Sequence, residues 1–172
     1  MSRSRYRLEC ELWLPVPIDR VWDFGSNPKN LAGISPKHLG VRIPNPPACE
    51  NGALVIIEMA PLGIPLPLKW HSRLSDVQST GPKRLFVDTQ ETGPFAYWRH
   101  EHHFESGDSE VTAHSNGQKV KMREAGTWIR DFVEYDVPFG PAGLLAHKLF
   151  GRGQLEAMFA YRTKMFRSVF LS

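Results

Sequence analysis

One long helical pattern is present in this chain, and it lies at the C-terminal end. Apolar side chains recur there at the three- and four-residue spacing of a single helix face, from about residue 142 to residue 170. This face comprises Leu145, Leu149, Leu155, Phe159, Phe166 and Phe170. Gly151 and Gly153 interrupt the pattern and predict a kink, because glycine weakens a helix interior. An amphipathic helix of this length has to pack against another layer of structure, which the preceding residues must supply.

The preceding residues have the patterns of β-strands. In residues 6–14, YRLECELWL, apolar and polar side chains alternate as in a half-buried strand. Two short helices are predicted next, one beginning after Pro17 and one capped by Asn27 with Pro28 in its first turn. Further strands, separated by turns rich in proline and glycine, are predicted at residues 39–43, 53–60, 65–77, 84–90, 97–104 and 126–137. We therefore predict an α+β fold in which a curved antiparallel sheet of about seven strands wraps around the C-terminal helix.

Length and composition exclude several functional classes. The 172 residues are expected to form a single domain spanning residues 1–172. The net charge of +3 is small and the basic residues are scattered, so no nucleic-acid partner is expected. The longest apolar run, Ala53–Ile57, is too short to span a bilayer, and the N-terminus has no apolar run of the signal-peptide type. We expect a soluble cytoplasmic protein without an integral membrane segment, in which Cys10 and Cys49 form no disulfide framework or zinc site.

Three histidines fall within four positions of the segment YWRHEHHF, residues 97–104. Alternate residues of a strand share a face, so this segment divides into two sets. The set that carries two aromatic side chains is assigned to the interior and consists of Trp98, His100, His102 and Phe104. His103 belongs to the opposite, mostly charged set and is assigned to solvent.

The neighbouring predicted strands bring further polar groups to the same interior. The same alternation places Asp88 on the face of its strand that also carries Phe86 and Gln90. On the last predicted strand, Asp131 shares a face with Tyr135. If these faces converge, the interior holds two carboxylates, two histidines and a tyrosine among aromatic side chains. Buried polar groups need partners, so this set predicts either an internal hydrogen-bond network or a site for a polar head group.

Three functional interpretations of the two inward histidines stay open, beside a structural one in which the polar groups satisfy one another. In the first, His100 and His102 bind a metal with Asp131 as third ligand; no third histidine lies in phase, and we predict neither metal nor cofactor. In the second, His100 or His102 is an acid or base oriented by Asp88 or Asp131, with Tyr135 as a donor. In the third, the same groups form the polar end of a mainly apolar pocket.

Four segments carry a family resemblance. They are LPVPIDRVWDFGSNPKNLAGISP, LFVDTQETGPFAYWRHEHHF, GTWIRDFVEYDVPFGPAG and MFAYR. They resemble the START/Bet v 1-like superfamily, also called SRPBCC, and within it a bacterial branch of largely uncharacterised ligand-binding domains. The resemblance covers most of the chain and implies a helix-grip fold. It departs at residues 106–124, where relatives have a much shorter turn; a long hairpin insertion with Asn116-Gly117 as its turn is predicted here.

The resemblance also implies a cavity between sheet and helix that holds an apolar or amphipathic molecule. It does not imply a reaction, because members include lipid carriers, hormone receptors, polyketide cyclase/dehydratases and oxygenase domains. We therefore expect binding of a hydrophobic or amphipathic small molecule rather than catalysis. The expected ligand-binding residues are Trp70, Phe86, Asp88, Gln90, Phe95, Trp98, His100, His102, Phe104, Ile129, Asp131, Tyr135 and Phe159.

Two alternatives to simple binding follow from the same residues. A cyclase- or dehydratase-type enzyme would use His100 or His102 with Asp131 in the same cavity. A protein-interaction module would instead use the apolar, proline-rich segment 59–68. This segment is a candidate pocket rim or a contact with another subunit, so a homodimer is compatible with the sequence.

Overall fold

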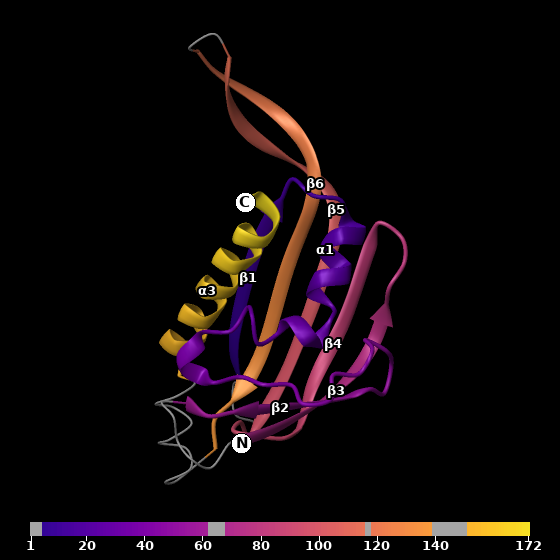
Figure 1. The fold of residues 1–172 in the computed structure, drawn as a ribbon, viewed down its shortest axis with the longest axis vertical. Coiled ribbons are helices and arrows are strands. Elements are labelled where there is room, and N and C mark those ends of the chain that lie inside the picture. The colour runs from indigo at the N-terminus through magenta and orange to yellow at the C-terminus, as the bar shows by residue number, and fades with distance from the viewer. Residues whose placement is uncertain (1–4, 62–67, 116–117, 139–150) are drawn as a thin grey trace.

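The computed structural model of the chain describes residues 5–61, 68–115, 118–138 and 151–172. An antiparallel sheet and one long helix make up most of this structure (Figure 1). The elements, in chain order, are β1 (Tyr6–Leu14), α1 (Ile18–Gly25), the 3₁₀ helices η1 (Pro28–Asn30) and η2 (Lys37–Leu39), β2 (Leu54–Met59), β3 (Leu68–Gln78), β4 (Lys83–Thr92), β5 (Tyr97–Ser115), β6 (Gln118–Asp136) and α3 (Arg152–Leu171). The predicted α+β architecture, with short helices after the first strand and a C-terminal helix against an antiparallel sheet, is confirmed.

The described strands form one six-stranded sheet in the order β1-β6-β5-β4-β3-β2. Every neighbouring pair is antiparallel. Because β1 pairs with β6, the first and last strands lie side by side, while β2 forms the opposite edge. The helices α1 and α3 cover the same face of this sheet, where Phe24 of α1 meets Phe166 of α3 edge to face, with ring centroids 5.3 Å apart. The core and the site therefore lie between this face and the helices.

Alternation along the central strands builds the interior, as predicted for β5. The inward residues of β5 that were assigned to the core are buried: Trp98, His100, His102 and Phe104. The inward residues of β6 are buried as well: Thr127, Ile129, Asp131, Val133 and Tyr135. Leu155, Phe159 and Phe166 form the buried face of α3. His103 lies on the outer face, where its Nε2 is 2.8 Å from a carboxylate oxygen of Glu101.

One strand prediction is wrong. Residues 39–43 do not form a strand, and Arg42 makes one isolated bridge with Glu58. Leu39 ends the 3₁₀ helix η2, and Gly40 adopts a left-handed conformation with φ of 56° that turns the chain out of the extended path. Prolines cannot donate to a strand ladder, and three follow closely: Pro44, Pro46 and Pro47. The described sheet therefore has six strands instead of about seven.

The segment 106–124 belongs to a two-stranded arm formed by the far ends of β5 and β6. The pairing of these strands continues without a break from Ser106↔Thr127 to Ser115↔Gln118. Figure 1 shows the arm extending well beyond the other strands. Val120 and Met122 on the arm are 45% and 50% exposed, so their side chains contribute little to the core. The predicted Asn116-Gly117 turn lies outside the described residues.

Two other predictions fall partly outside the described residues. The apolar segment 59–68 is described only at its ends, since residues 62–67 are not included. The helix predicted from about residue 142 is described from Arg152 onward, with Gly151 as its N-cap in an extended conformation. The kink predicted at Gly151 and Gly153 would also involve the residues before Gly151, which lie outside the described residues.

Candidate functional site

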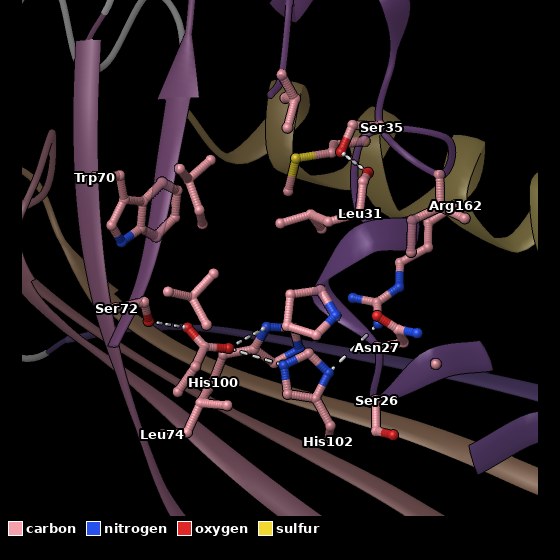
Figure 2. A pocket seen from close by; sticks show the side chains of 18 of the residues that line it. Ser26, Asn27, Leu31, Ser35, Trp70, Ser72, Leu74, His100, His102 and Arg162 are labelled. Atoms are coloured by element: carbon pink, nitrogen blue, oxygen red, sulfur yellow. Dashed lines mark hydrogen bonds and ion pairs between the residues drawn. The ribbon is translucent and has the colours of Figure 1, made fainter. Parts of the chain in front are cut away.

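A cavity of about 140 Å³ lies between the inner face of the sheet and the helices (Figure 2). Strands β2 to β5 form one wall, and α3 together with the segment that follows α1 forms the other. Its wall is mainly apolar, through Leu31, Ile34, Leu39, Val41, Val55, Ile57, Met59, Trp70, Leu74, Phe86, Trp98, Met158 and Phe159. A cluster of polar side chains lies at one end of it, where Figure 2 shows Ser72, His100 and His102, while Ser35 lies apart from this cluster.

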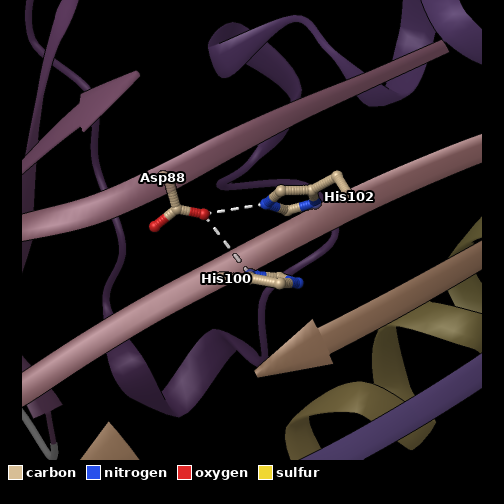
Figure 3. Close-up of side chains that lie close together, drawn as sticks. All are labelled: Asp88, His100 and His102. Carbon is tan, nitrogen blue, oxygen red and sulfur yellow. Dashed lines mark hydrogen bonds and ion pairs between the residues drawn. The ribbon is translucent and has the colours of Figure 1, made fainter. Parts of the chain in front are cut away.

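Asp88 and the two histidines form the centre of this polar end. Strand register brings them together, because Asp88 of β4 pairs with His100 of β5 and Phe86 pairs with His102. The carboxylate oxygen Oδ2 of Asp88 lies 2.8 Å from His102 Nε2 and 3.4 Å from His100 Nδ1. Figure 3 shows both imidazole rings turned toward this carboxylate. All three side chains line the cavity.

Asp131 lies on the other side of the same two rings. It pairs with His102 in the β5–β6 register, and its Oδ1 lies 2.9 Å from His100 Nε2 and 3.2 Å from His102 Nδ1. Arg162 of α3 reaches this point, with Nη1 3.7 Å from Asp131 Oδ1 and Nη2 3.4 Å from His102 Nδ1. Two imidazoles are thus held between two carboxylates, and a guanidinium partly balances the negative charge.

The second oxygen of Asp88 is also fully engaged. Oδ1 accepts hydrogen bonds from the Ser72 hydroxyl at 2.9 Å and from the Trp98 indole N–H at 3.0 Å. These donors come from β3 and β5, the two strands that flank β4. They fix the carboxylate plane, so Oδ2 stays directed at the histidines. Trp70 also lines the cavity, and its buried indole nitrogen has no hydrogen-bond partner among the described residues.

Burial and close contacts set the charges of this cluster. Burial alone would raise the pKa of Asp88, but hydrogen bonding and the electrostatic influence of both histidines outweigh it and lower the pKa to about 2. Burial opposes ionisation of Asp131 too, yet Arg162 and hydrogen bonds from both histidines hold its pKa well below the usual range. Burial is the main cause that lowers the pKa of His100 to about 4, and the proximity of His102 lowers it further. The contact with Asp131 acts in the opposite direction and only partly offsets these effects. At neutral pH both carboxylates are ionised and His100 is neutral.

The expected ligand-binding residues divide into those on the cavity wall and those behind it. The wall contains Trp70, Phe86, Asp88, Trp98, His100, His102 and Phe159. Asp131 lies behind the histidines. Phe104 and Ile129 belong to the packed cluster around α1, and Phe95 and Tyr135 to a second cluster with Trp98. Gln90 donates through Nε2 to the Phe95 carbonyl oxygen at 2.8 Å, which ties the turn after β4 to that second cluster.

Several wall residues were not among those expected from the sequence. Arg162 is the most consequential, because it is the cation nearest the two histidines. Its position three residues after Phe159 and four before Phe166 places it on the buried helix face, so the spacing contained the signal. The segment after α1 adds Asn27, Leu31 and Ser35 to the wall. No periodicity marks these residues, because they lie in short irregular turns.

An antiparallel sheet closed on one side by a C-terminal helix, with a cavity between them, defines the helix-grip class of ligand-binding folds. A family model described as polyketide cyclase / dehydrase and lipid transport matches residues 14–159, and the chain belongs to this family. The family resemblance stated from the sequence motifs is thereby confirmed.

Solved structures agree with this assignment at the level of the fold. Norcoclaurine synthase from Thalictrum flavum, a point mutant in complex with a transition-state analogue, superposes with a TM-score of 0.56 at 18% identity, covering 96% of each chain. The ginseng major latex-like protein 151 from Panax ginseng reaches 0.59 at 11% identity, covering 98% of this chain and 99% of that one. No curated protein sequence matches the chain at a significant level. Among the described residues, no helix combines the length and apolar character needed to cross a membrane.

Proposed function

We propose that the protein binds a hydrophobic or amphipathic small molecule in the cavity between the sheet and α3. The observation that carries this proposal is a mainly apolar cavity with a cluster of histidine and carboxylate side chains at one end. Apolar walls favour transfer of a ligand out of water, and a few fixed polar groups orient it. The apolar part of the ligand would contact residues such as Ile57 and Met158. Its polar end would face Asp88 and the two histidines.

The size of the cavity indicates what part of a ligand it holds. A cavity of about 150 Å³ is enough for a benzene molecule in a well-packed protein interior. The cavity here, at about 140 Å³, therefore accommodates a portion the size of one aromatic ring. Norcoclaurine synthase, which shares the fold, has been crystallised with dopamine and hydroxybenzaldehyde, both single-ring molecules. This supports an amphipathic ring compound, or a ring-sized part of a larger lipid, as the ligand class.

Native mass spectrometry of the untagged protein as purified, followed by denaturing extraction, tests this proposal directly. A stoichiometric organic mass that is released on unfolding is the supporting result. In parallel, calorimetric titration with 4-methylphenol tests binding of an amphipathic single ring. A protein that carries no organic molecule and does not bind 4-methylphenol would contradict the proposal.

Two variants on β2 place the binding in the cavity. Ile57 lines the cavity, whereas Ile56 is the next residue on the same strand and points to the other face. Ile57→Trp fills the cavity and should abolish binding of 4-methylphenol. Ile56→Trp adds the same bulk outside and should leave the affinity unchanged. Equal effects of the two substitutions would show that the ligand binds elsewhere.

A second candidate function is catalysis of the cyclase or dehydratase type. It is favoured by the 2.9 Å contact between His100 Nε2 and Asp131, because a histidine oriented by a carboxylate at a cavity wall is the arrangement of a general acid or base. Loss of water from a β-hydroxy ketone, followed through the absorbance of the enone product, tests this candidate. Turnover that is lost in His100→Ala and kept in His103→Ala would support it. Absence of turnover in the unmodified protein would leave binding as the function.

A further inference from the structure

Asp88, His100 and His102 present three possible metal-ligand atoms to one point. One carboxylate oxygen and two imidazole nitrogens lie within 4.8 Å of one another, on side chains from two neighbouring strands. Both nitrogens approach the same oxygen, Asp88 Oδ2, with His102 Nε2 at 2.8 Å and His100 Nδ1 at 3.4 Å. Figure 3 shows the two rings converging on this carboxylate. His100 and His102 are 4% and 6% exposed, so this is a buried cluster and not a surface group of acids.

The contacts within this cluster need more protons than a pair of neutral imidazoles carries. The two histidines make four nitrogen–oxygen contacts with the two carboxylates, at 2.8, 2.9, 3.2 and 3.4 Å. A neutral imidazole carries one N–H, and a carboxylate carries none. Hydrogen bonds in all four contacts would therefore require a proton on each of the four ring nitrogens, so that both imidazoles would be cations.

With one proton on each ring, the neighbouring protein donors satisfy only part of these contacts. If the N–H groups occupy the two shortest contacts, Arg162 Nη2 at 3.4 Å can donate to the free His102 Nδ1. His100 Nδ1 is then left facing Asp88 Oδ2 with no donor from the described residues. Buried lone pairs that face each other are unfavourable, because nothing replaces the hydrogen bonds lost to water. A cation between them would remove the conflict.

We propose that Asp88 Oδ2, His100 Nδ1 and His102 Nε2 bind one divalent first-row transition-metal ion at the polar end of the cavity. Two imidazole nitrogens and one carboxylate oxygen form a donor set that suits Zn²⁺ and Fe²⁺. Because all three residues line the cavity, the coordination positions that the protein does not fill face the space where a ligand would bind. The sequence pattern alone suggested Asp131 as the third ligand, but the structure puts Asp131 behind the rings and Asp88 in front of them.

The groups around this set fit the same assignment. With the metal on the Asp88 side, each histidine carries its proton on the far nitrogen, and both far nitrogens face Asp131 at 2.9 and 3.2 Å. Histidines that bind metals commonly donate their second N–H to a carboxylate in this way. Ser72 and Trp98 hold the other oxygen of Asp88. All four histidine–carboxylate contacts are then accounted for, two as hydrogen bonds and two as metal coordination.

Metal titration of the untagged, chelator-treated protein tests the proposal. Calorimetry with Zn²⁺ and visible absorption with Co²⁺ should each show one equivalent bound, with a Co²⁺ spectrum of low coordination number. His100→Ala, His102→Ala and Asp88→Asn should abolish the stoichiometric site. Asp131→Asn should weaken binding by about 10- to 100-fold, as for other carboxylates that orient a histidine ligand. His103→Ala is the matched control, since it removes a neighbouring imidazole from the outer face and should have no effect.

Two results would overturn the proposal. One is failure of the unmodified protein to take up an equivalent of either ion, which requires no variant to fold. The other is uptake that His103→Ala reduces as much as His100→Ala, which would assign the metal to surface histidines. Circular dichroism identifies any variant that does not fold, and the remaining ligand variants then decide. Metal uptake is measured without an organic ligand, so its outcome is separate from that of the proposed small-molecule binding.

Discussion

The ring of Phe86 lies almost parallel to the imidazole of His102, with ring centroids 4.1 Å apart and planes inclined by 13°. Phe86 also meets the Trp22 ring edge to face at 6.0 Å, so one aromatic side chain connects the polar end of the cavity with α1. This stack fixes the plane of the His102 ring, and the contact with Asp88 selects the orientation in which Nε2 faces that carboxylate. The position of the histidine thus depends on core packing as well as on hydrogen bonds.

Phe86→Ala should lower the free energy of unfolding by about 3–5 kcal/mol, because it removes a buried ring and leaves a void between the sheet and α1. Urea denaturation followed by circular dichroism measures this loss. The control is Leu85→Ala on the same strand, whose side chain is half-buried on the other face and should cost much less. Similar losses in the two variants would show that Phe86 does not hold the aromatic cluster together.

Two glycines should respond to alanine in opposite directions. A Cβ on Gly126 would clash with the Leu14 carbonyl oxygen and the Trp13 ring, where β1 and β6 approach closely. Gly126→Ala should therefore cost about 1–3 kcal/mol, as other overpacked sites do. A Cβ on Gly153 of α3 meets no described atom within 4 Å, so Gly153→Ala should stabilise the helix by about 0.5–1 kcal/mol. Thermal denaturation of both variants checks the two signs together.

The side-chain directions at the polar end were predictable from the sequence because the strands there are regular. The pairings β4–β5 and β5–β6 run without a register shift past His100 and His102, so a period of two assigns every side chain correctly. Strand β3 shows the limit of this argument. Its register shifts between Ser75 and Gln78, and Asp76 has a positive φ of 54°, which the alternating pattern does not reveal.

The partners of the histidines were less accessible to sequence reasoning. The sequence offered both Asp88 and Asp131 as neighbours, but not which lies on the cavity side. That depends on the side-chain rotamers and on how α3 crosses the sheet. Arg162 was missed for a different reason: its spacing from Phe159 and Phe166 puts it on the buried helix face, but a charged side chain is usually exposed. Tertiary geometry, and not local pattern, decides which carboxylate faces the cavity.

The two cysteines should be slow to alkylate in the folded protein. Burial is the main cause that raises the pKa of Cys49 to about 11, and the negative charge of Glu50 adds to it. The pKa of Cys10 is also raised to about 11, mainly by burial and then by the negative charge of Asp131. At pH 8 the thiolate fraction should be about 100-fold lower than for an ordinary thiol, since the reactive form is the anion. Mass spectrometry after iodoacetamide treatment, with and without urea, measures the difference. Equal rates in the two conditions would contradict it.

The same shifts predict how stability changes at high pH. A thiol whose pKa is raised by folding loses its proton more easily in the unfolded chain. The contribution of Cys49 is therefore fully present below about pH 9 and is lost as the pH rises toward 11. Cys49→Ala should flatten the fall in stability over that range, which urea denaturation at pH 8, 9 and 10 can follow.

Removal of the two-stranded arm should leave the body of the fold intact. Replacing residues 109–124 by Asn-Gly joins Asp108 directly to its partner Ala125 through a two-residue hairpin turn. The hydrogen bonds of Trp13 and Trp128 to the carbonyl oxygens of Gly107 and Asp108 are kept. The free energy of unfolding should change by less than about 1 kcal/mol, because loop length alone has a small entropic effect. A large drop would show that the arm contributes to the core.

The position of β1 beside β6 has a consequence for synthesis of the chain. Their paired residues are more than 110 positions apart, so β1 leaves the ribosome long before its partner exists. Contacts of such sequence separation form late and slow folding. Until β6 has been synthesised, the apolar side chains of β1, among them Leu8, Leu12 and Leu14, have no strand beside them. The nascent polypeptide therefore exposes near its N-terminus apolar groups that the folded protein buries.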